Sequence, residues 1–309
     1  IKDVTVYKGS IPAEFGGRVS SVLDIQMNEG NNQDYHVSGG IGLISSKLNV
    51  EGPIQKGKSS FLVTGRRTYA DVFLGLSNDE SLKGSQLYFY DLNAKVNYSI
   101  NDKNRIYLSG YFGKDVLGFN NIFGFDWGNT TGTARWNHIV NSKLFSNTSL
   151  IYSDYRYNIG ITNAGFDFDI KSKIQDWNLK QEFTYYPSTK HTVKFGFNSI
   201  YHTIEPGNIQ AKSAESQINS TNVESRYAWE NAVFVSDDWK VSDKLHLSYG
   251  LRVSSFSLLG QGTFYVFDKD GNTIDSNVYA SGEFAKTYFN PEPRMSINYI
   301  INPKTSIKA

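Results

Sequence analysis

Cysteine is absent from the 309-residue sequence, and methionine occurs only twice. Without thiols, neither a disulfide framework nor a thiolate metal site can form. Excess charge is missing as well: 31 basic residues against 30 acidic ones give a net charge of +1, which gives no indication of a nucleic-acid partner. No uninterrupted run of about 18 apolar residues occurs, which excludes a membrane-spanning helix. A membrane-spanning strand needs only ~9–11 residues with one apolar face. The sequence therefore does not exclude a membrane protein built of strands.

Aromatic residues, by contrast, are abundant. The chain has 20 Tyr, 20 Phe and 5 Trp, yet its mean hydropathy is −0.41. Many aromatic residues in a polar chain fit a β protein with aromatic belts at a membrane surface. They equally fit a β-sandwich with an adhesive surface.

A strict alternation runs through the stretch NAKVNYSINDKNRIYLSGYF, residues 93–112. On either side of a polar turn at 101–104, every second residue is apolar or glycine, and the intervening residues are polar or tyrosine. This period of two predicts two strands of a hairpin, each with two unlike faces. Similar hairpins are predicted around turns at 56–58, 141–143, 187–190, 242–244 and 302–304, most weakly at 141–143.

The connections between these hairpins are predicted to be long. They cover residues 68–91, 113–132, 155–176, 202–229 and 255–291, which are rich in Asn, Gly, Ser and Asp. Long structureless loops are uncommon in a compact domain, whereas an outer-membrane barrel alternates short periplasmic turns with long extracellular loops. The alternation of connection lengths therefore favours a barrel over a soluble sandwich.

The charges and aromatic residues of the predicted strands agree with a barrel. Lys95, Lys180, Lys194 and Arg252 all fall on the face opposite the apolar row, where a polar lumen tolerates them. The apolar row carries aromatic residues toward strand ends, as a girdle at the membrane interface would: Tyr98, Phe112, Trp177, Tyr185, Tyr249 and Tyr299. Tyr and Phe are also good strand formers, and a sandwich core would produce the same alternation.

The first 31 residues, IKDVTVYKGSIPAEFGGRVSSVLDIQMNEGN, do not read as a barrel hairpin. Two short strands are predicted, the second at Val22-Leu23-Asp24-Ile25. The glycine-rich sequence between them contains Lys8-Gly9, Pro12-Ala13 and Phe15-Gly16-Gly17. This segment resembles the end of the plug domain of TonB-dependent outer-membrane receptors, in a form similar to those of Bacteroidota. The stretches TGRRTYAD (64–71) and YDLNAKVNYSINDKNRIYLSGYFGKD (90–115) resemble the first barrel strands of the same family.

The resemblance implies an all-β fold, a transmembrane antiparallel barrel of 22 strands filled by a plug. We expect residues 1–32 to be the C-terminal end of the plug and residues 33–309 to form barrel strands 1 to about 12. No signal peptide is present and both ends are abrupt, so we interpret the chain as a slice of a longer receptor. Such a slice is expected to form a curved sheet with two free edges rather than a closed barrel.

The function implied by the resemblance is active import across the outer membrane of a Gram-negative bacterium, without enzymatic activity and without a cofactor. The implied partners are outer-membrane lipid, a small-molecule or oligomeric nutrient, a surface lipoprotein, and TonB with ExbB and ExbD through a part of the receptor outside this chain. Iron–siderophores, haem, cobalamin, oligosaccharides and peptides are all substrates of the family, and the sequence does not choose among them.

The best candidate for ligand binding is GFNNIFGFDWGN (118–129), predicted as an extracellular loop. It holds Phe119, Phe123, Phe125 and Trp127, and exposed aromatic patches tend to mark binding sites. The alternative is a loop that folds on itself or on a neighbour.

Contacts between the plug and the barrel lumen are predicted at Arg18, Asp24, Arg66 and Arg67. One of the two adjacent arginines is expected to face the lumen, where it would pair with a plug carboxylate such as Asp24 or meet an anionic ligand. Structural pairing is the simpler alternative.

Motifs of catalysis or metal binding are missing from the sequence. The five histidines have no ligand spacing, and no P-loop, HExxH, GxSxG or dinucleotide fingerprint occurs. FDKDGNT (267–273) resembles the start of a calcium-binding loop, but it lacks the later ligands of such a loop. Asp270-Gly271 is instead a strong signal for a hairpin turn. Asp167 and Asp169 are interpreted as solvated loop charges.

Two other classes of protein remain in competition. A passive porin would lack a plug, so residues 1–31 would not lie in a lumen. A secreted β-sandwich adhesin or carbohydrate-binding protein would turn the apolar rows toward a second packed layer.

Overall fold

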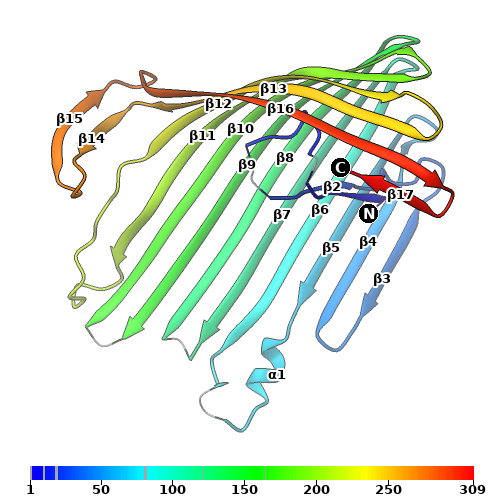
Figure 1. Cartoon of the computed structure of the whole chain (residues 1–309). Helices are drawn as coiled ribbons and strands as arrows, with labels where there is room; N and C mark the ends of the chain where they lie inside the picture. The colour runs from blue at the N-terminus through cyan, green and yellow to red at the C-terminus, as the bar shows by residue number, and fades with distance from the viewer. Residues whose placement is uncertain (1, 10, 18–19, 80–81, 121, 164) are drawn as a thin grey trace.

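The computed structural model describes residues 2–9, 11–17, 20–79, 82–120, 122–163 and 165–309. Most of the described chain is strand, arranged in one large sheet and two small ones (Figure 1). The first small sheet pairs β1 (Asp3–Tyr7) with β2 (Val22–Gln26), and the second pairs β14 (Gly262–Phe267) with β15 (Thr273–Tyr279). A single described helix, α1 (Asp71–Gly75), has five residues, and the described part of the chain contains no helix that is long and apolar enough to span a membrane.

The large sheet has thirteen strands, one more than the number expected from the sequence. They are β3 (His36–Ile41), β4 (Ser45–Gln55), β5 (Ser59–Thr68), β6 (Gln86–Asn101), β7 (Asn104–Phe119), β8 (Phe123–Asn141), β9 (Leu144–Asn163), β10 (Phe166–Ser188), β11 (His191–Ala211), β12 (Arg226–Lys240), β13 (Leu245–Leu259), β16 (Phe284–Asn302) and β17 (Thr305–Lys308).

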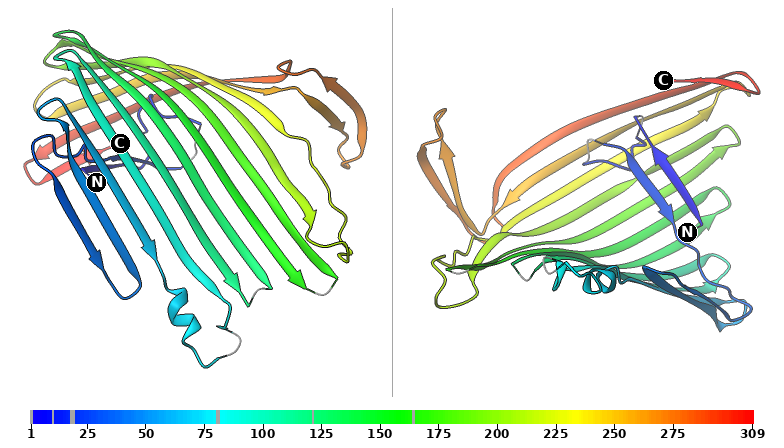
Figure 2. Two further views of the ribbon diagram at one scale, coloured as in Figure 1. Left: turned by 180° about the vertical axis from the view of Figure 1, so that it is seen from behind. Right: turned by 90° about the horizontal axis from the view of Figure 1, so that it is seen from below.

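Each strand of the large sheet pairs antiparallel with the strand that precedes it in this order. The sheet curves strongly and does not close, which leaves β3 and β17 as its two edges (Figure 2). This confirms the expected open, curved sheet.

The long loops predicted from the sequence are mostly strand, and that prediction is wrong. Residues 113–119 and 123–132 continue β7 and β8, and residues 166–176 and 202–211 belong to β10 and β11. The connections at that end of the sheet are accordingly shorter: 69–85 with α1, 120–122, 164–165, 212–225, and 260–283 with the hairpin β14–β15. The opposite end has the tight turns that the sequence predicts. In outer-membrane barrels generally, the end with the longer connections is the extracellular one.

The two faces of the sheet differ in what covers them. One face carries the apolar row, and its side chains are exposed: Leu108 is 53% exposed and Phe195 37%. No second layer of the described chain packs on this outward face. The inward face carries Lys95, Lys194 and Arg252, and the described residues of the N-terminal segment lie against it (Figure 2).

Burial is therefore inverted relative to a soluble protein. Arg252, Asn97 and Ser60 are among the most deeply buried side chains, whereas more than fifty large hydrophobic side chains are exposed. In water such a surface would lead to aggregation. In a bilayer it is the stable arrangement, because hydrocarbon covers the apolar row and every interior strand satisfies its backbone groups on its neighbours.

Prediction: a lysine on the outward face destabilises the sheet in a bilayer, and one on the inward face does not. Leu108→Lys should lower the free energy of unfolding by roughly 2–4 kcal/mol if Leu108 lies near mid-depth. Thr133→Lys is the matched control, since Thr133 pairs with Ser109, the inward neighbour of Leu108. Urea titration of the protein in lipid vesicles measures both. Equal effects of the two variants would contradict the assignment of the faces.

Candidate functional site: the inner wall and the segment against it

The turn at residues 11–17 is held by two arginines of the inner wall. Nη1 of Arg294 on β16 lies 3.0 Å, 2.6 Å and 2.5 Å from the carbonyl oxygens of Ile11, Pro12 and Phe15. Three carbonyl oxygens around one cationic nitrogen form strong, charge-assisted contacts. Arg294 thus binds the turn through its main chain.

Arg252 on β13 is the second arginine that binds the turn. Its side chain is only 1% exposed, and its Nη1 lies 3.4 Å from the carbonyl oxygen of Ala13. Glu292 links the two arginines, at 2.6 Å from Nη2 of Arg294 and 3.8 Å from Nε of Arg252. A buried guanidinium needs such a partner, because an unpaired buried charge is strongly unfavourable.

Gly16 explains why the turn contains a Gly-Gly pair. A Cβ atom at Gly16 would lie 2.2 Å from Nε of Arg252, so no larger residue fits without displacing the arginine. Gly17 has a φ of +69°, which glycine adopts without strain. The first glycine is required by close approach and the second by backbone conformation.

Side chains of the segment add further contacts with the wall. The carboxylate of Glu14 lies 2.7 Å from Nζ of Lys194 on β11, and the Glu14 side chain is 6% exposed. Nζ of Lys180 on β10 lies 5.3 Å from the ring centre of Phe15, within the range of a cation–π contact.

A second anchor lies nearer the tight turns, around Glu29. Its carboxylate pairs with Arg105 on β7 at 2.9 Å. Its carbonyl oxygen accepts hydrogen bonds from Ser60 on β5 and Asn97 on β6, both at 2.8 Å. Lys95 adds a bond of 3.3 Å to the carbonyl oxygen of Met27. The segment is therefore fixed at two places on the inward face, one at β13 and β16 and the other at β5, β6 and β7.

A cavity of about 530 Å³ opens beside Gly17 on the inward face. Residues of β9 to β13 and β16 line it, among them Tyr155, His202 and Asn290. His202 lies between two carboxylates, with Nδ1 2.7 Å from Asp176 and Nε2 3.8 Å from Glu230. The cavity borders both the turn and the wall, so any movement of the turn changes its shape.

The four aromatic residues predicted to bind ligand lie on strands and not in a long loop. Phe119 ends β7, while Phe123, Phe125 and Trp127 lie on β8. The structure brings them together in pairs: Phe119 with Phe123 at 6.4 Å and Phe125 with Trp127 at 4.7 Å between ring centres, with Tyr157 of β9 beside Phe125.

These aromatic residues share the inward face, because their strands pair without interruption down to Arg105. Neighbouring strands add apolar residues at the same level of this face: Leu117, Ile159, Ile161, Phe168 and Ile170. We call these residues, the four aromatic residues and Tyr157 the vestibule patch. The outward face at this level is polar, with Asp126, Asn158 and Lys171. The polarity of the two faces is thus the reverse of that in the membrane-spanning part.

The structure separates the other predicted lumen residues. Arg66 faces inward and pairs with Asp91 of β6 at 2.8 Å, which is pairing within the wall rather than with Asp24. Arg67 faces outward, over the ring of Tyr88. Asp24 forms no ion pair with a described residue, and Arg18 lies outside the described residues.

The segment 267–273 is a turn in the structure. Asp268 accepts hydrogen bonds from the backbone N–H groups of Asp270 and Asn272 and from the Asn272 side chain. These bonds, with those from Asn272 foremost, hold the pKa of Asp268 below its ordinary value. Among the described residues, no group of three or more His, Asp or Glu could hold a metal ion.

The sequence analysis missed Arg294, Glu292, Glu29 and Arg105 as contacts of the N-terminal segment. Their positions on the polar side of alternating strands could have marked them as inward-facing. Their partners could not be found this way, because the accepting groups are mostly main-chain carbonyls, which every residue has.

Comparison with known proteins agrees with this architecture. A family described as "Outer membrane beta barrel domain" matches residues 206–309. This match covers about a third of the chain. Together with the large sheet and its exposed apolar face, it shows the fold of an outer-membrane β-barrel, of which the chain forms an open part. The location of the chain is the outer membrane of a Gram-negative bacterium. The comparison with curated proteins found no match to the sequence.

Several solved transporters and receptors share the fold. The FrpB iron transporter from Neisseria meningitidis aligns over 100% of this chain and 52% of its own, with a TM-score of 0.68 and 13% identity. The copper transporter OprC aligns over 96% and 47%, with a TM-score of 0.68 and 12% identity. FpvAI in its complex with pyocin S2 aligns over 99% and 44%, with a TM-score of 0.70 and 13% identity. The chain thus spans about half the length of these structures.

Prediction: Arg294→Met loosens the turn at residues 11–17. Losing charge-assisted bonds worth ~1.5–3 kcal/mol should speed local opening by roughly one to two orders of magnitude. Hydrogen exchange of the amides of 11–17, followed by mass spectrometry, measures it. Arg66→Met is the matched control, because Arg66 pairs only with the wall. Unchanged exchange in Arg294→Met would contradict the role given to this arginine.

Proposed function

We propose that this chain is part of a TonB-dependent receptor that actively imports a scarce nutrient across the outer membrane. The observation that carries the proposal is the segment held against the inner wall by Arg294, Arg252, Lys194 and Arg105. A passive porin needs an open lumen and has no use for such a segment. A soluble sandwich would need a second layer on the apolar rows, and in the described chain that layer is absent.

The contacts between the N-terminal segment and the inner wall suit a segment that blocks the lumen reversibly. They are ion pairs and hydrogen bonds to carbonyl oxygens on a polar wall, where water can replace each partner as the segment leaves. An apolar interface of the same size would expose hydrocarbon surface on opening and would favour permanent closure. In this proposal TonB, driven through ExbB and ExbD, supplies the force, and a surface lipoprotein is a further candidate partner.

Prediction: a covalent link between the segment and the wall stops import. Because the chain has no cysteine, Glu14→Cys with Lys194→Cys gives one defined pair that a short bis-maleimide can bridge. We expect the bridged full-length receptor to lose uptake, measured as growth of the deletion strain when one nutrient class at a time is limiting. Each single-cysteine variant treated in the same way is the control.

The same assay separates active from passive transport. An active importer loses uptake both with the bridge and in cells without TonB. Uptake that persists in both conditions would show a passive channel and reject the proposal.

The vestibule patch is the proposed first contact of the substrate. An apolar inner surface facing an aqueous entrance is unfavourable unless something covers it, and aromatic rings offer flat surfaces for ring-bearing or apolar parts of a ligand. The patch and the cavity beside Gly17 would then be successive contacts on the way inward.

Prediction: Trp127→Ala raises the substrate concentration for half-maximal uptake by about tenfold, the effect of losing ~1–2 kcal/mol of ring contact. His138→Ala is the control, because His138 lies on the same strand near the tight turns. The maximal rate should stay unchanged if the patch acts in capture. A change in the maximal rate alone would place Trp127 in translocation instead.

A further inference from the structure

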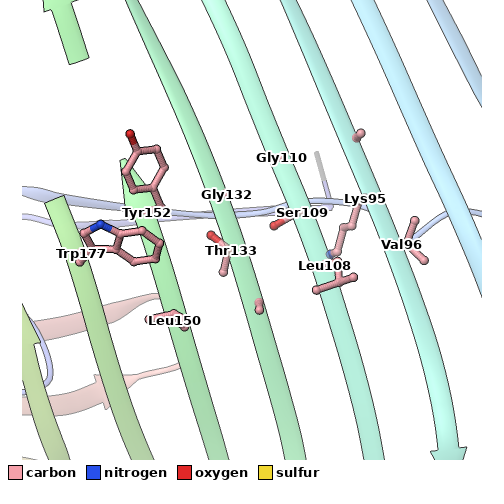
Figure 3. A pocket seen from close by; sticks show the side chains of 12 residues that line it. Lys95, Val96, Leu108, Ser109, Gly110, Gly132, Thr133, Leu150, Tyr152 and Trp177 are labelled. Atoms are coloured by element: carbon pink, nitrogen blue, oxygen red, sulfur yellow. The ribbon is translucent and has the colours of Figure 1, made fainter. Parts of the chain in front are cut away.

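The pairing of β6, β7 and β8 fixes which side chains share the inward face beyond the membrane-spanning part. The outward face of β6 to β10 carries an apolar groove, beside residues such as Leu108 and Leu150 (Figure 3). Ser109 and Thr133 are direct partners on the opposite, inward face. Because side chains alternate between the two faces of a strand, the residues six positions further toward the longer connections also face inward.

Asp115 lies on this inward face, directly between two aromatic residues. It pairs with Phe89 of β6 on one side and with Trp127 of β8 on the other. Residues opposed in this way have their Cβ atoms about 4.5–5.5 Å apart, so their side chains are neighbours. Trp127 belongs to the vestibule patch, and Asp115 therefore places a carboxylate at the edge of that patch.

The carboxylate of Asp115 has no counter-ion in the described chain. None of the described residues forms a hydrogen bond or an ion pair with it. Partial burial raises the pKa of Asp115 above its ordinary value, and the nearby carboxylate of Asp91 raises it further. Arg66 has a smaller, opposing effect, since its guanidinium group is bound to Asp91 at 2.8 Å. A cation placed beside Asp115 would favour its ionised form.

The neighbouring strands contain a complete form of the same arrangement. Nε and Nη2 of Arg66 on β5 both lie 2.8 Å from a carboxylate oxygen of Asp91. The guanidinium carbon of Arg66 also lies 4.7 Å from the ring centre of Phe89. A carboxylate and an aromatic ring thus hold one cation between them, by a charge-assisted bond and a cation–π contact. Asp115 and Trp127 present the same two groups without a cation, and Trp offers the best ring for one.

Tyr111 adds a hydroxyl group beside this carboxylate. A Cβ atom at Gly113 would lie 2.2 Å from the hydroxyl oxygen of Tyr111, so this hydroxyl takes the place of a side chain at position 113. That place is beside Asp91, the partner of Gly113, and two residues from Asp115 on the same face. The hydroxyl oxygen can accept a hydrogen bond from an ammonium or guanidinium group.

The charge of the surrounding wall favours a cationic ligand over an anionic one. From the level of Asp91 toward the longer connections, the inward positions of β6 to β10 that the structure describes carry only two charged residues, Asp91 and Asp115. Arg66 neutralises the first, and the second stays unpaired. An anionic ligand would be repelled here, and a neutral apolar ligand would cover a carboxylate without pairing it, which is unfavourable.

We propose that Asp115, the ring of Trp127 and the hydroxyl group of Tyr111 form a subsite for a cationic group of the imported substrate, either a primary ammonium or a guanidinium. The inference rests on the proposed function and narrows its substrate to organic cations. Such a substrate joins a positive charge, which Asp115 pairs, to an apolar or ring-bearing part, which the rest of the vestibule patch covers. A peptide with lysine or arginine side chains has this chemistry.

Binding to the purified full-length receptor in detergent tests the subsite without import. The probes are three dansyl-labelled peptides of one sequence, which carry two lysines, two acetylated lysines or two glutamates in the same places. Acetylation removes the positive charge of a lysine and keeps its carbon chain. We expect the lysine peptide to bind about tenfold more tightly than the acetylated one, the effect of one charge-assisted contact, and the glutamate peptide to bind least.

Two substitutions at Asp115 and one matched control locate the effect. Asp115→Asn keeps the size of the side chain and should abolish the preference for the lysine peptide while leaving binding of the acetylated peptide unchanged. Asp115→Arg puts a cation on the protein itself, as Arg66 does over Phe89, and should abolish the same preference. Asp126→Asn is the control, because Asp126 lies at this level of β8 but faces outward and pairs with Lys114 at 2.9 Å. It should keep the preference of the unaltered receptor.

Two outcomes would overturn the inference: equal binding of the lysine and acetylated peptides to the unaltered receptor, or a preference that survives in Asp115→Asn. A cation from another part of the full-length receptor resting on Asp115 would give the first of these results. The proposed function can fail separately, because binding in detergent requires neither TonB nor a membrane. A receptor that prefers the lysine peptide through Asp115 but does not import would reject only the proposed function.

Discussion

Contact with hydrocarbon on one side of a single sheet is the constraint on which the rest of this structure depends. It requires that charged and hydrogen-bonding side chains be placed on the other side, and the most buried side chains of the chain are accordingly Arg252, Asn97 and two serines. These side chains need partners, because a buried unpaired charge is costly. The N-terminal segment supplies partners for Arg252, Asn97 and Ser60, so the polar wall and the segment stabilise each other.

The partners are largely backbone atoms, and this determines how the segment is held. Arg294 binds three carbonyl oxygens in one turn, while Ser60 and Asn97 bind a single carbonyl oxygen at the other anchor. The strands β1 and β2 pair with each other rather than with the wall. The segment is thus fixed at the turn that joins these two strands and again just after β2. In the proposed receptor, this arrangement suits release of the hairpin as a unit.

Much of this architecture follows from the sequence, and the failures have a physical cause. The period-two pattern in residues 93–112 predicts β6 and β7 and assigns their faces correctly, because hydrocarbon imposes a strict alternation there. The same reasoning misread Phe123, Phe125 and Trp127 as a loop. These residues belong to β8, but above the membrane the apolar residues change to the inward face, so the pattern shifts phase and the alternation is interrupted between Trp127 and Ala134. The clustering of the aromatic residues was visible in the sequence. The contacts of Arg294 were not, because its partners are main-chain carbonyl oxygens, which every residue has.

The grip of Arg294 on main-chain oxygens also bears on how such a protein can change over evolutionary time. Because the arginine recognises the path of the chain, its own contacts do not depend on which side chains stand at positions 11 and 15, provided that the turn keeps its shape. The burden falls instead on Gly16, whose missing side chain makes room for Arg252. In the proposed receptor, a wall of this kind can vary its ligand-facing surfaces while the N-terminal segment continues to fit.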